Sequence, residues 1–467
     1  MFNARQTSPL GNLLRTMLAV ALLLAARTAA AEPGNDAGAL PSSSDAGLLA
    51  SATDAPADAG PAAKEPPLDV REAPFANGDW NWLDGQNRQP NSLLVAGPVT
   101  FSVLVDVYFG WQFAQPSDHT IFPGTTAPRH DEIGLNLVSV GAEITGLDGP
   151  IGRLVLQAGD NVATDAGQDQ TTTRGFFLSQ NALEFIQQAA AGWHFHVMHG
   201  LNVEAGLLLS YVGLESYVPE ENWNYTHPFL SDFTPYYFSG VRTQLYPTQD
   251  LKLELWIVNG WQTFGEWHET KALGELIQWR PGERLTFTHD FYVGHEERYD
   301  PHALRIYSDN SAQLQYLKHV GFIDSAALAL VGDLGFEHRA LAASGWMGGA
   351  SLTNRVEVGR FALTVRGDLF YDQTQALIQQ LPTSAGVNSA LPDSGPFLGG
   401  GFAATVDFWP SPWLLCRLEY GHRAANIPYF SGPGGITAPA SGADASTFVP
   451  DLRKSDDRLV LNVTLRL

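Results

Sequence analysis

Residues Val99–Phe113 read VTFSVLVDVYFGWQF, and this stretch decides the fold. Every odd position carries a large apolar side chain, whereas polar residues such as Ser102, Asp106 and Gln112 stand at even positions. A period of two indicates a β-strand with one apolar face, because a helix would spread both sets around its circumference. The strand is long for a soluble sheet, but its length suits a tilted strand that crosses a bilayer and continues beyond it.

The same alternation recurs toward the C-terminus. It is clear in 201–211, 284–294 and 361–372, and it is weaker in 271–280 and 306–317. Turn-forming sequences predict tight connections at 147–150, 247–250, 281–283, 359–360 and 410–412. Long polar or Pro/Gly-rich loops fall at 114–131, 161–175, 218–233, 374–395 and 426–455. Short and long connections therefore alternate along the chain, as they do in bacterial outer-membrane barrels.

These patterns predict an all-β fold, a transmembrane antiparallel up-and-down barrel of about sixteen strands. The strands are expected to begin near residues 99, 132, 151, 176, 201, 234, 251, 270, 284, 304, 323, 345, 361, 396, 412 and 456. Both ends of the barrel then lie on the short-turn, periplasmic side. The last stretch, 457–467, alternates like the C-terminal signal that outer-membrane insertion machinery reads, although it ends in Leu467 and that signal usually ends in Phe.

The N-terminal part of the chain predicts export. Residues 1–31 have the features of a cleaved signal peptide: basic residues, an apolar core at Leu18–Ala26, and small residues up to Ala31. Residues 32–95 form an acidic Ala/Asp/Pro-rich segment, with a short lead-in to the first strand. Its composition cannot bury enough apolar surface to order it, so we expect a disordered periplasmic segment. The barrel is assigned to residues 96–467.

Composition narrows the function classes. Charged residues make up only 16% of the chain, and the formal net charge is −22. A chain this acidic is a poor partner for nucleic acid, which is bound through Lys and Arg. After the N-terminus, no apolar stretch reaches the length of about 18 residues that a membrane-spanning helix needs. The single cysteine, Cys416, excludes an intramolecular disulfide and is expected to fill space on the apolar face.

A barrel of about sixteen strands leaves an aqueous lumen, so its inward face decides the function. Charged residues of both signs occupy mid-strand positions on the expected polar face. The pore-lining candidates are Asp106, Arg153, Glu204, Arg242, Asp290, Asp333, Arg366, Asp368, Arg417 and Glu419. Opposed charges across a lumen orient polar solutes and set ion preference. Total charge is a poor guide to selectivity, because much of it lies in the loops and the N-terminal segment; we expect a weak preference for cations.

Catalytic patterns are weak. The chain has no Gly-x-Ser-x-Gly and no His-Glu-x-x-His sequence, and adjacent His289 and Asp290 point to opposite faces of a strand. His194 and His196 would share a face and could hold a metal, but three histidines near a turn are more often incidental. The sequence therefore predicts a protein that is not an enzyme and that needs no cofactor or metal. A rim-active outer-membrane hydrolase stays as an alternative.

Residues 236–296 resemble the OmpL-like family of outer-membrane β-barrel porins. The resemblance is carried by Ser239-Gly240-Val241-Arg242, Ile257-Val258-Asn259-Gly260-Trp261, Lys271-Ala272-Leu273-Gly274 and Gly294-His295-Glu296. It extends more loosely over residues 99–467 and implies a porin-like barrel that passes small solutes.

Aromatic residues near the expected strand ends are interpreted as lipid-interface girdles. Trp261 would lie in the headgroup zone, which tryptophan favours. The other members of the expected girdles are Trp111, Phe113, Trp279, Phe408, Trp409 and Trp413.

The most direct hypothesis is a water-filled outer-membrane channel for small hydrophilic solutes and ions. Its expected partners are outer-membrane lipid, lipopolysaccharide and the insertion machinery, and a homo-oligomer is compatible with the fold. A second hypothesis is a structural barrel whose lumen is closed by loop 374–395 or 426–455 and whose acidic periplasmic segment binds a partner.

Overall fold

A computed structural model describes residues 94–144, 149–166, 168–169, 183–248, 250–266, 270–296, 300, 302–381, 391, 395–438 and 448–467. The expected signal peptide and nearly all of the acidic segment lie outside these residues, so both stay predictions. No helix in the described ranges is long and apolar enough to cross a membrane.

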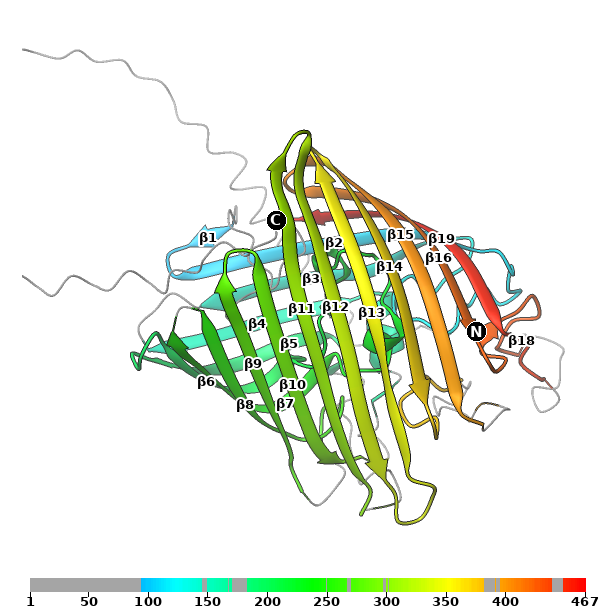
Figure 1. Cartoon of the computed structure of the whole chain (residues 1–467), viewed down its shortest axis with the longest axis horizontal. Helices are drawn as coiled ribbons and strands as arrows, with labels where there is room; N and C mark the ends of the chain where they lie inside the picture. The colour runs from blue at the N-terminus through cyan, green and yellow to red at the C-terminus, as the bar shows by residue number, and fades with distance from the viewer. Residues whose placement is uncertain are drawn as a thin grey trace, which may run out of the picture. The chain divides into compact units, whose positions relative to one another are not determined.

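Sixteen long strands build the described part of the chain (Figure 1). Their bounds are β2 (Val99–Gln112), β3 (Glu132–Ile144), β4 (Pro150–Ala158), β5 (Ile186–Phe195), β6 (Leu201–Leu209), β7 (Tyr237–Thr248), β8 (Leu251–Val258), β9 (Ala272–Gly282), β10 (Leu285–His295), β11 (Leu304–Val320), β12 (Ile323–His338), β13 (Gly345–Val358), β14 (Phe361–Asp372), β15 (Phe397–Ser411), β16 (Leu414–Ala425) and β19 (Ser455–Arg466). Minor elements are β1 (Val95–Ala96), β17 (Phe430–Ser431), β18 (Leu452–Arg453), α2 (Asp160–Ala166), the 3-10 turn η2 (Pro219–Glu221) and α4 (Phe229–Asp232).

Each long strand pairs antiparallel with the next one along the chain, and β19 pairs with β2 to close the ring. The predicted all-β barrel and its sixteen strands are confirmed. Fifteen of the predicted strand starts lie within three residues of the observed ones. The prediction for the fourth strand is wrong, because β5 begins at Ile186 and not near residue 176.

The two faces of the barrel wall differ in polarity. Along β14, every residue on one face is exposed and every residue on the other is buried. Leu363 and Leu369 are among the exposed ones, and Thr364, Arg366 and Asp368 are among the buried ones. This is the reverse of a soluble sheet, and it is what a lipid-facing exterior and a polar lumen require.

Tight hairpins join the strands at the end where the barrel begins and finishes. Gly321 and Gly359 take left-handed φ angles of 64° and 58° at the first position of two-residue turns, where a side chain would be strained. Long connections leave the opposite end, so the predicted alternation is confirmed.

Trp261 is a correction to the expected aromatic girdle. Its ring packs edge-on against Tyr292 and Tyr307, at centroid distances of 4.9 and 5.2 Å, and both tyrosines are fully buried on the inward face. The Arg305 guanidinium lies 5.1 Å from the same ring. Trp261 therefore anchors a loop to the inside of the wall. Phe113 and Trp279, by contrast, are about half exposed on the outside.

Candidate functional site

A long connection between β6 and β7 lies inside the barrel. We call residues 210–236 the lumen segment; it contains η2 and α4. Its side chains and backbone contact inward-facing residues of β2, β13, β14, β16 and β19. Because these strands belong to one side of the ring, the segment is attached to that side of the lumen.

Arginines on that side bind the backbone of the lumen segment. Arg417 of β16 donates to the carbonyl oxygens of Pro219 and Asn222, each at 2.6 Å. Arg366 of β14 donates to Thr226 O at 2.6 Å, and Arg355 of β13 donates to Trp223 O at 3.3 Å. Arg423 of β16 donates to His227 O and forms an ion pair with Asp232 at 2.9 Å. Charged donors make these hydrogen bonds stronger than neutral ones.

Carboxylates between the arginines bind the donors of the segment. Glu419 of β16 accepts from the backbone N–H groups of Tyr225 and Thr226, at 2.6 and 3.0 Å. Asp106 of β2 accepts from the Tyr225 hydroxyl at 2.9 Å. Asp368 of β14 accepts from the Phe229 N–H at 3.2 Å. Donors and acceptors of the segment are thus both satisfied by the wall, which fixes one conformation of its backbone.

An aromatic cluster holds the C-terminal half of the segment. Phe229 and Phe233 of the α4 region stack at 5.5 Å, and Phe233 meets Phe370 and Phe397 at 5.2 and 6.1 Å. Residues from two other loops join the same cluster, among them Leu377, Ile378, Ile427 and Tyr429.

This changes the second hypothesis from the sequence. Loops 374–395 and 426–455 were expected to close the lumen themselves. In their described parts they pack against the lumen segment, which is the element that the inward arginines hold.

All ten pore-lining candidates are buried on the inward side. Six contact the lumen segment: Asp106, Asp290, Arg366, Asp368, Arg417 and Glu419. Three form a cluster on β4, β6 and β7, in which Glu204 accepts from Arg153 at 2.8 Å and also from Arg242. Asp333 accepts from the Tyr307 hydroxyl at 2.6 Å. Whether they line a conducting path stays a prediction.

A row of carboxylates lies on β10 to β12, the strands that precede β13 in the ring. Asp290, Asp309 and Asp333 stand directly opposite one another on β10, β11 and β12. Each has one buried oxygen without a hydrogen-bond partner. Like charges at facing positions are unfavourable. The lumen thus has an acidic row beside the strands rich in arginine. The lumen segment contacts both, because the Gly213 N–H donates to Asp290 at 3.3 Å.

Sequence reasoning missed Arg355, Arg423 and Asp309. All three lie on the inward face of strands that the sequence predicted. Each is an even number of residues away from other buried polar residues of its strand. Extending the alternation to the ends of those strands would have found them. The lumen segment itself has no such signal, because its contacts lie about 120 to 250 residues away along the chain.

The histidine pair does not form a metal site in the described residues. The rings of His194 and His196 are 5.1 Å apart, and His194 Nδ1 hydrogen-bonds Asn202 at 2.7 Å. No group of three or more His, Cys, Asp or Glu in the described ranges has the geometry to hold a metal ion.

Two acidic residues of the lumen segment predict a pH dependence. Burial raises the pKa of Glu215 and of Glu221 to about 7, although Arg366 and Arg466 respectively lower them. The docked segment therefore holds protons that a solvated carboxyl releases near 4.5, and docking weakens as pH rises from about 4.5 through 7. We expect a lower conductance at pH 5 than at pH 8, measured in planar bilayers. The double variant Glu215→Gln/Glu221→Gln should flatten the profile; a higher conductance at pH 5 would contradict the assignment.

A closed barrel with an apolar exterior, a charged lumen and an internal loop defines the class of outer-membrane porin barrels. The family model described as "Putative beta-barrel porin-2, OmpL-like" matches residues 98–452, and the chain belongs to this family. It is an outer-membrane porin. The resemblance noted in the sequence is confirmed. No curated protein matches the chain.

Solved porins are similar to this chain at low identity. The anion-selective porin from Comamonas acidovorans is 9% identical, with 79% of this chain and 99% of that chain covered and a TM-score of 0.49. The outer membrane channel DcaP of Acinetobacter baumannii is 8% identical, with coverage of 80% and 99% and a TM-score of 0.47. Salmonella typhi OmpF in complex with daunomycin is 9% identical, with coverage of 80% and 99% and a TM-score of 0.47.

Proposed function

We propose that this porin passes small hydrophilic solutes and ions by diffusion, and that the lumen segment sets the width and charge of the path. The observation that carries the proposal is the set of four inward arginines, Arg355, Arg366, Arg417 and Arg423, that bind the segment's backbone carbonyls. A loop that only filled space would not need charged donors to its carbonyls along residues 219–227. The segment acts as a fixed constriction that is bound to the arginine-bearing strands and also reaches the acidic row at Asp290.

The charge of the lumen favours cations. Acidic side chains outnumber basic ones among the buried residues in the described ranges. The inward arginines of β13, β14 and β16 are engaged by the lumen segment, whereas the carboxylate row on β10 to β12 is not covered by any of them. Rings of Asp and Glu select cations. In a KCl gradient we expect a reversal potential of the cation-selective sign, and an anion-selective sign would overturn this part of the proposal.

The decisive test is single-channel conductance of the refolded mature protein in a planar bilayer. Stable ohmic steps that scale with salt support an aqueous path past the lumen segment. The heat-modifiable gel mobility of a folded barrel is the control for folding. A folded barrel that stays silent, even after the lumen segment is shortened, would contradict diffusion and favour the structural alternative.

Substitution of Arg417 tests whether the inward arginines hold the lumen segment in place. Arg417→Ala removes three hydrogen bonds to the carbonyls of residues 219, 220 and 222. Since hydrogen bonds to charged groups each contribute about 1.5–3 kcal/mol, we expect the segment to fluctuate and the open-channel current noise to rise several-fold. Arg360→Ala, which removes an exposed guanidinium bound to Pro410 O, is the matched control and should leave the noise unchanged.

We further propose how the channel reaches the outer membrane and what its N-terminal segment does. Signal-peptide cleavage after Ala31 would deliver the chain to the periplasm, and the insertion machinery would place it in the outer membrane, against lipid and lipopolysaccharide. Nothing in the described lumen supports catalysis, so the protein is proposed to act as a channel and not as an enzyme. Residues 32–72 are proposed to act as a tether or spacer. Deleting them should leave conductance intact.

A further inference from the structure

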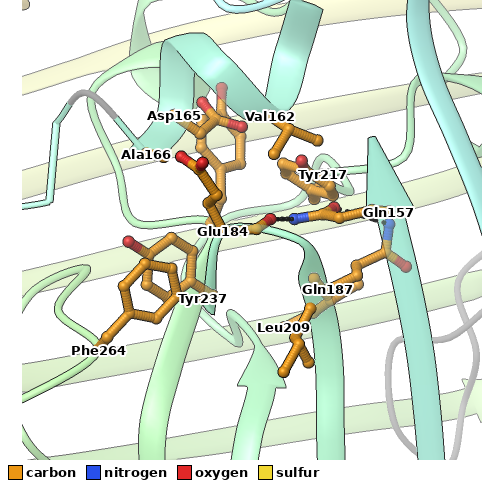
Figure 2. A pocket seen from close by; sticks show the side chains of 12 residues that line it. Gln157, Val162, Asp165, Ala166, Glu184, Gln187, Leu209, Tyr217, Tyr237 and Phe264 are labelled. Carbon is orange, nitrogen blue, oxygen red and sulfur yellow. Dashed lines mark hydrogen bonds between the residues drawn. The ribbon is translucent and has the colours of Figure 1, made fainter. Parts of the chain in front are cut away.

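A small pocket lies at the long-loop end of strands β4 to β7, under helix α2 (Figure 2). Gly159, at a left-handed φ of 139°, brings α2 against β3; a side chain there would meet Asn136 O at 2.4 Å. The cavity has a volume of about 10 Å³, enough for the centre of one water-sized group. Its charged lining comes from Asp165 of α2 and from Glu184 before β5, and Gln157 and Gln187 add neutral polar groups.

Asp165 is the unexplained group in this pocket. Its side chain is 3% exposed, and neither carboxyl oxygen has a hydrogen-bond partner. The twelve described residues that line the pocket include a second carboxylate, Glu184, and no basic residue. Figure 2 shows the Asp165 and Glu184 side chains at the same end of the pocket. Burial, and then the charge of Asp232, raise the pKa of Asp165 well above its usual range. An unpaired carboxylate in such a place is costly, so a positive ligand would stabilise it.

Aromatic rings form the rest of the pocket wall. Tyr237 and Phe264 stack at 4.6 Å with an interplanar angle of 13°, and Tyr217 meets Tyr236 edge-on at 5.7 Å. Hydrogen bonds fix these rings: the Tyr237 hydroxyl donates to Asp169 at 2.6 Å, and the Tyr236 hydroxyl lies 3.1 Å from Thr125 Oγ1. Aromatic rings beside a carboxylate attract cations through the negative faces of the rings. Both pairs are in place without a ligand.

We propose that this pocket binds the ammonium head of a primary amine, with Asp165 as its main anionic partner and Glu184 and the tyrosines around it. The size of the cavity excludes a quaternary ammonium and fits an –NH3+ group, which is close to water in size. Two of the three N–H donors of such a group match the two Asp165 oxygens that lack partners. The pocket shares Tyr217 and Tyr236 with the lumen segment but includes none of the arginines that bind it, and the proposal requires only the folded barrel.

Isothermal titration of the refolded full-length protein in detergent with methylammonium chloride tests the site. We expect saturable binding that exceeds binding of K+ at equal ionic strength, and none of the neutral analogue acetamide. Asp165→Asn keeps the shape but removes the charge, and should weaken methylammonium binding by at least about tenfold. Asp131→Asn removes an exposed charge on another long loop and is the matched control.

A second variant separates the aromatic contribution from the charge. Phe264→Leu keeps an apolar wall but removes a ring face, and should weaken methylammonium binding several-fold while gel mobility and KCl conductance stay unchanged. Equal binding by the wild type and Asp165→Asn would overturn the proposal, and so would equal affinities for methylammonium and K+. Neither of these results affects the porin assignment, which is read from conductance in KCl.

Discussion

Replacing residues 214–234 with a short Gly/Ser linker is expected to increase single-channel conductance several-fold in about 1 M KCl. At this salt concentration, interactions between exposed charges are screened, so the change reports mainly the width of the path. The lumen segment fills the side of the barrel next to β13, β14 and β16, and its backbone is bound there by four arginines and by Glu419. A barrel of sixteen strands without an internal loop leaves an aqueous channel. Removal should also expose the arginines and shift the reversal potential toward anions.

The control for this deletion is a change in a loop that stays outside the lumen. Residues 341–343, between β12 and β13, are exposed, and replacing them with Gly and Ser should leave conductance unchanged. If shortening the lumen segment produces a folded barrel whose conductance equals that of the wild type, the segment is not the constriction. The measurement is made on protein whose heat-modifiable mobility shows a closed barrel.

Glu204→Leu is expected to give the largest loss of stability among single substitutions. Glu204 is 1% exposed and lies between Arg153, at 2.8 Å, and Arg242. Both guanidinium groups are also buried, so removing the carboxylate leaves two positive charges facing each other. Breaking a buried ion pair by removing one partner costs about 3–5 kcal/mol. Urea unfolding of the refolded barrel, followed by tryptophan fluorescence, measures the change in the free energy of unfolding.

Two further variants make that result interpretable. Glu132→Leu removes the partner of Arg129 from a pair of similar length, 2.8 Å, that is about one third exposed, and such pairs contribute about 0–1 kcal/mol. The triple variant Glu204→Leu/Arg153→Met/Arg242→Met removes all three charges and should recover much of the loss. A loss for Glu204→Leu no larger than that for Glu132→Leu would mean that water reaches the cluster.

The sequence predicts the barrel well because its main signal is local. A period of two is set by strand geometry alone, so Val99–Phe113 and Phe361–Asp372 each identify a strand without any knowledge of their neighbours. Tight turns carry their own signal, as Gly359 shows by its left-handed φ. The inward position of all ten pore-lining candidates follows from the same two-residue alternation along the strands.

Two of the failures, at Trp261 and at the lumen segment, have one physical cause, which is that tertiary contacts override or replace local signals. The failure at the start of β5 is local. Trp261 is a residue type that favours the membrane interface, yet its ring packs against Tyr292 and Tyr307 on the inside of the wall. The start of β5 is displaced by ten residues because an apolar stretch, 176–185, precedes it without clear alternation. The lumen segment is held by strands far along the chain, and no local pattern reports such contacts.

The attachment of the lumen segment also constrains the order in which the protein can assemble. The segment follows the fifth long strand, but its partners are Arg355, Arg366, Arg417 and, on the final strand, Arg466. Contacts of this sequence separation form late, because a long chain must close before they can be made. We therefore expect the segment to dock fully only after the C-terminal strands have been added, so that a barrel intermediate with an incompletely docked segment precedes the mature one. A transiently leaky, protease-sensitive species during refolding would support this order.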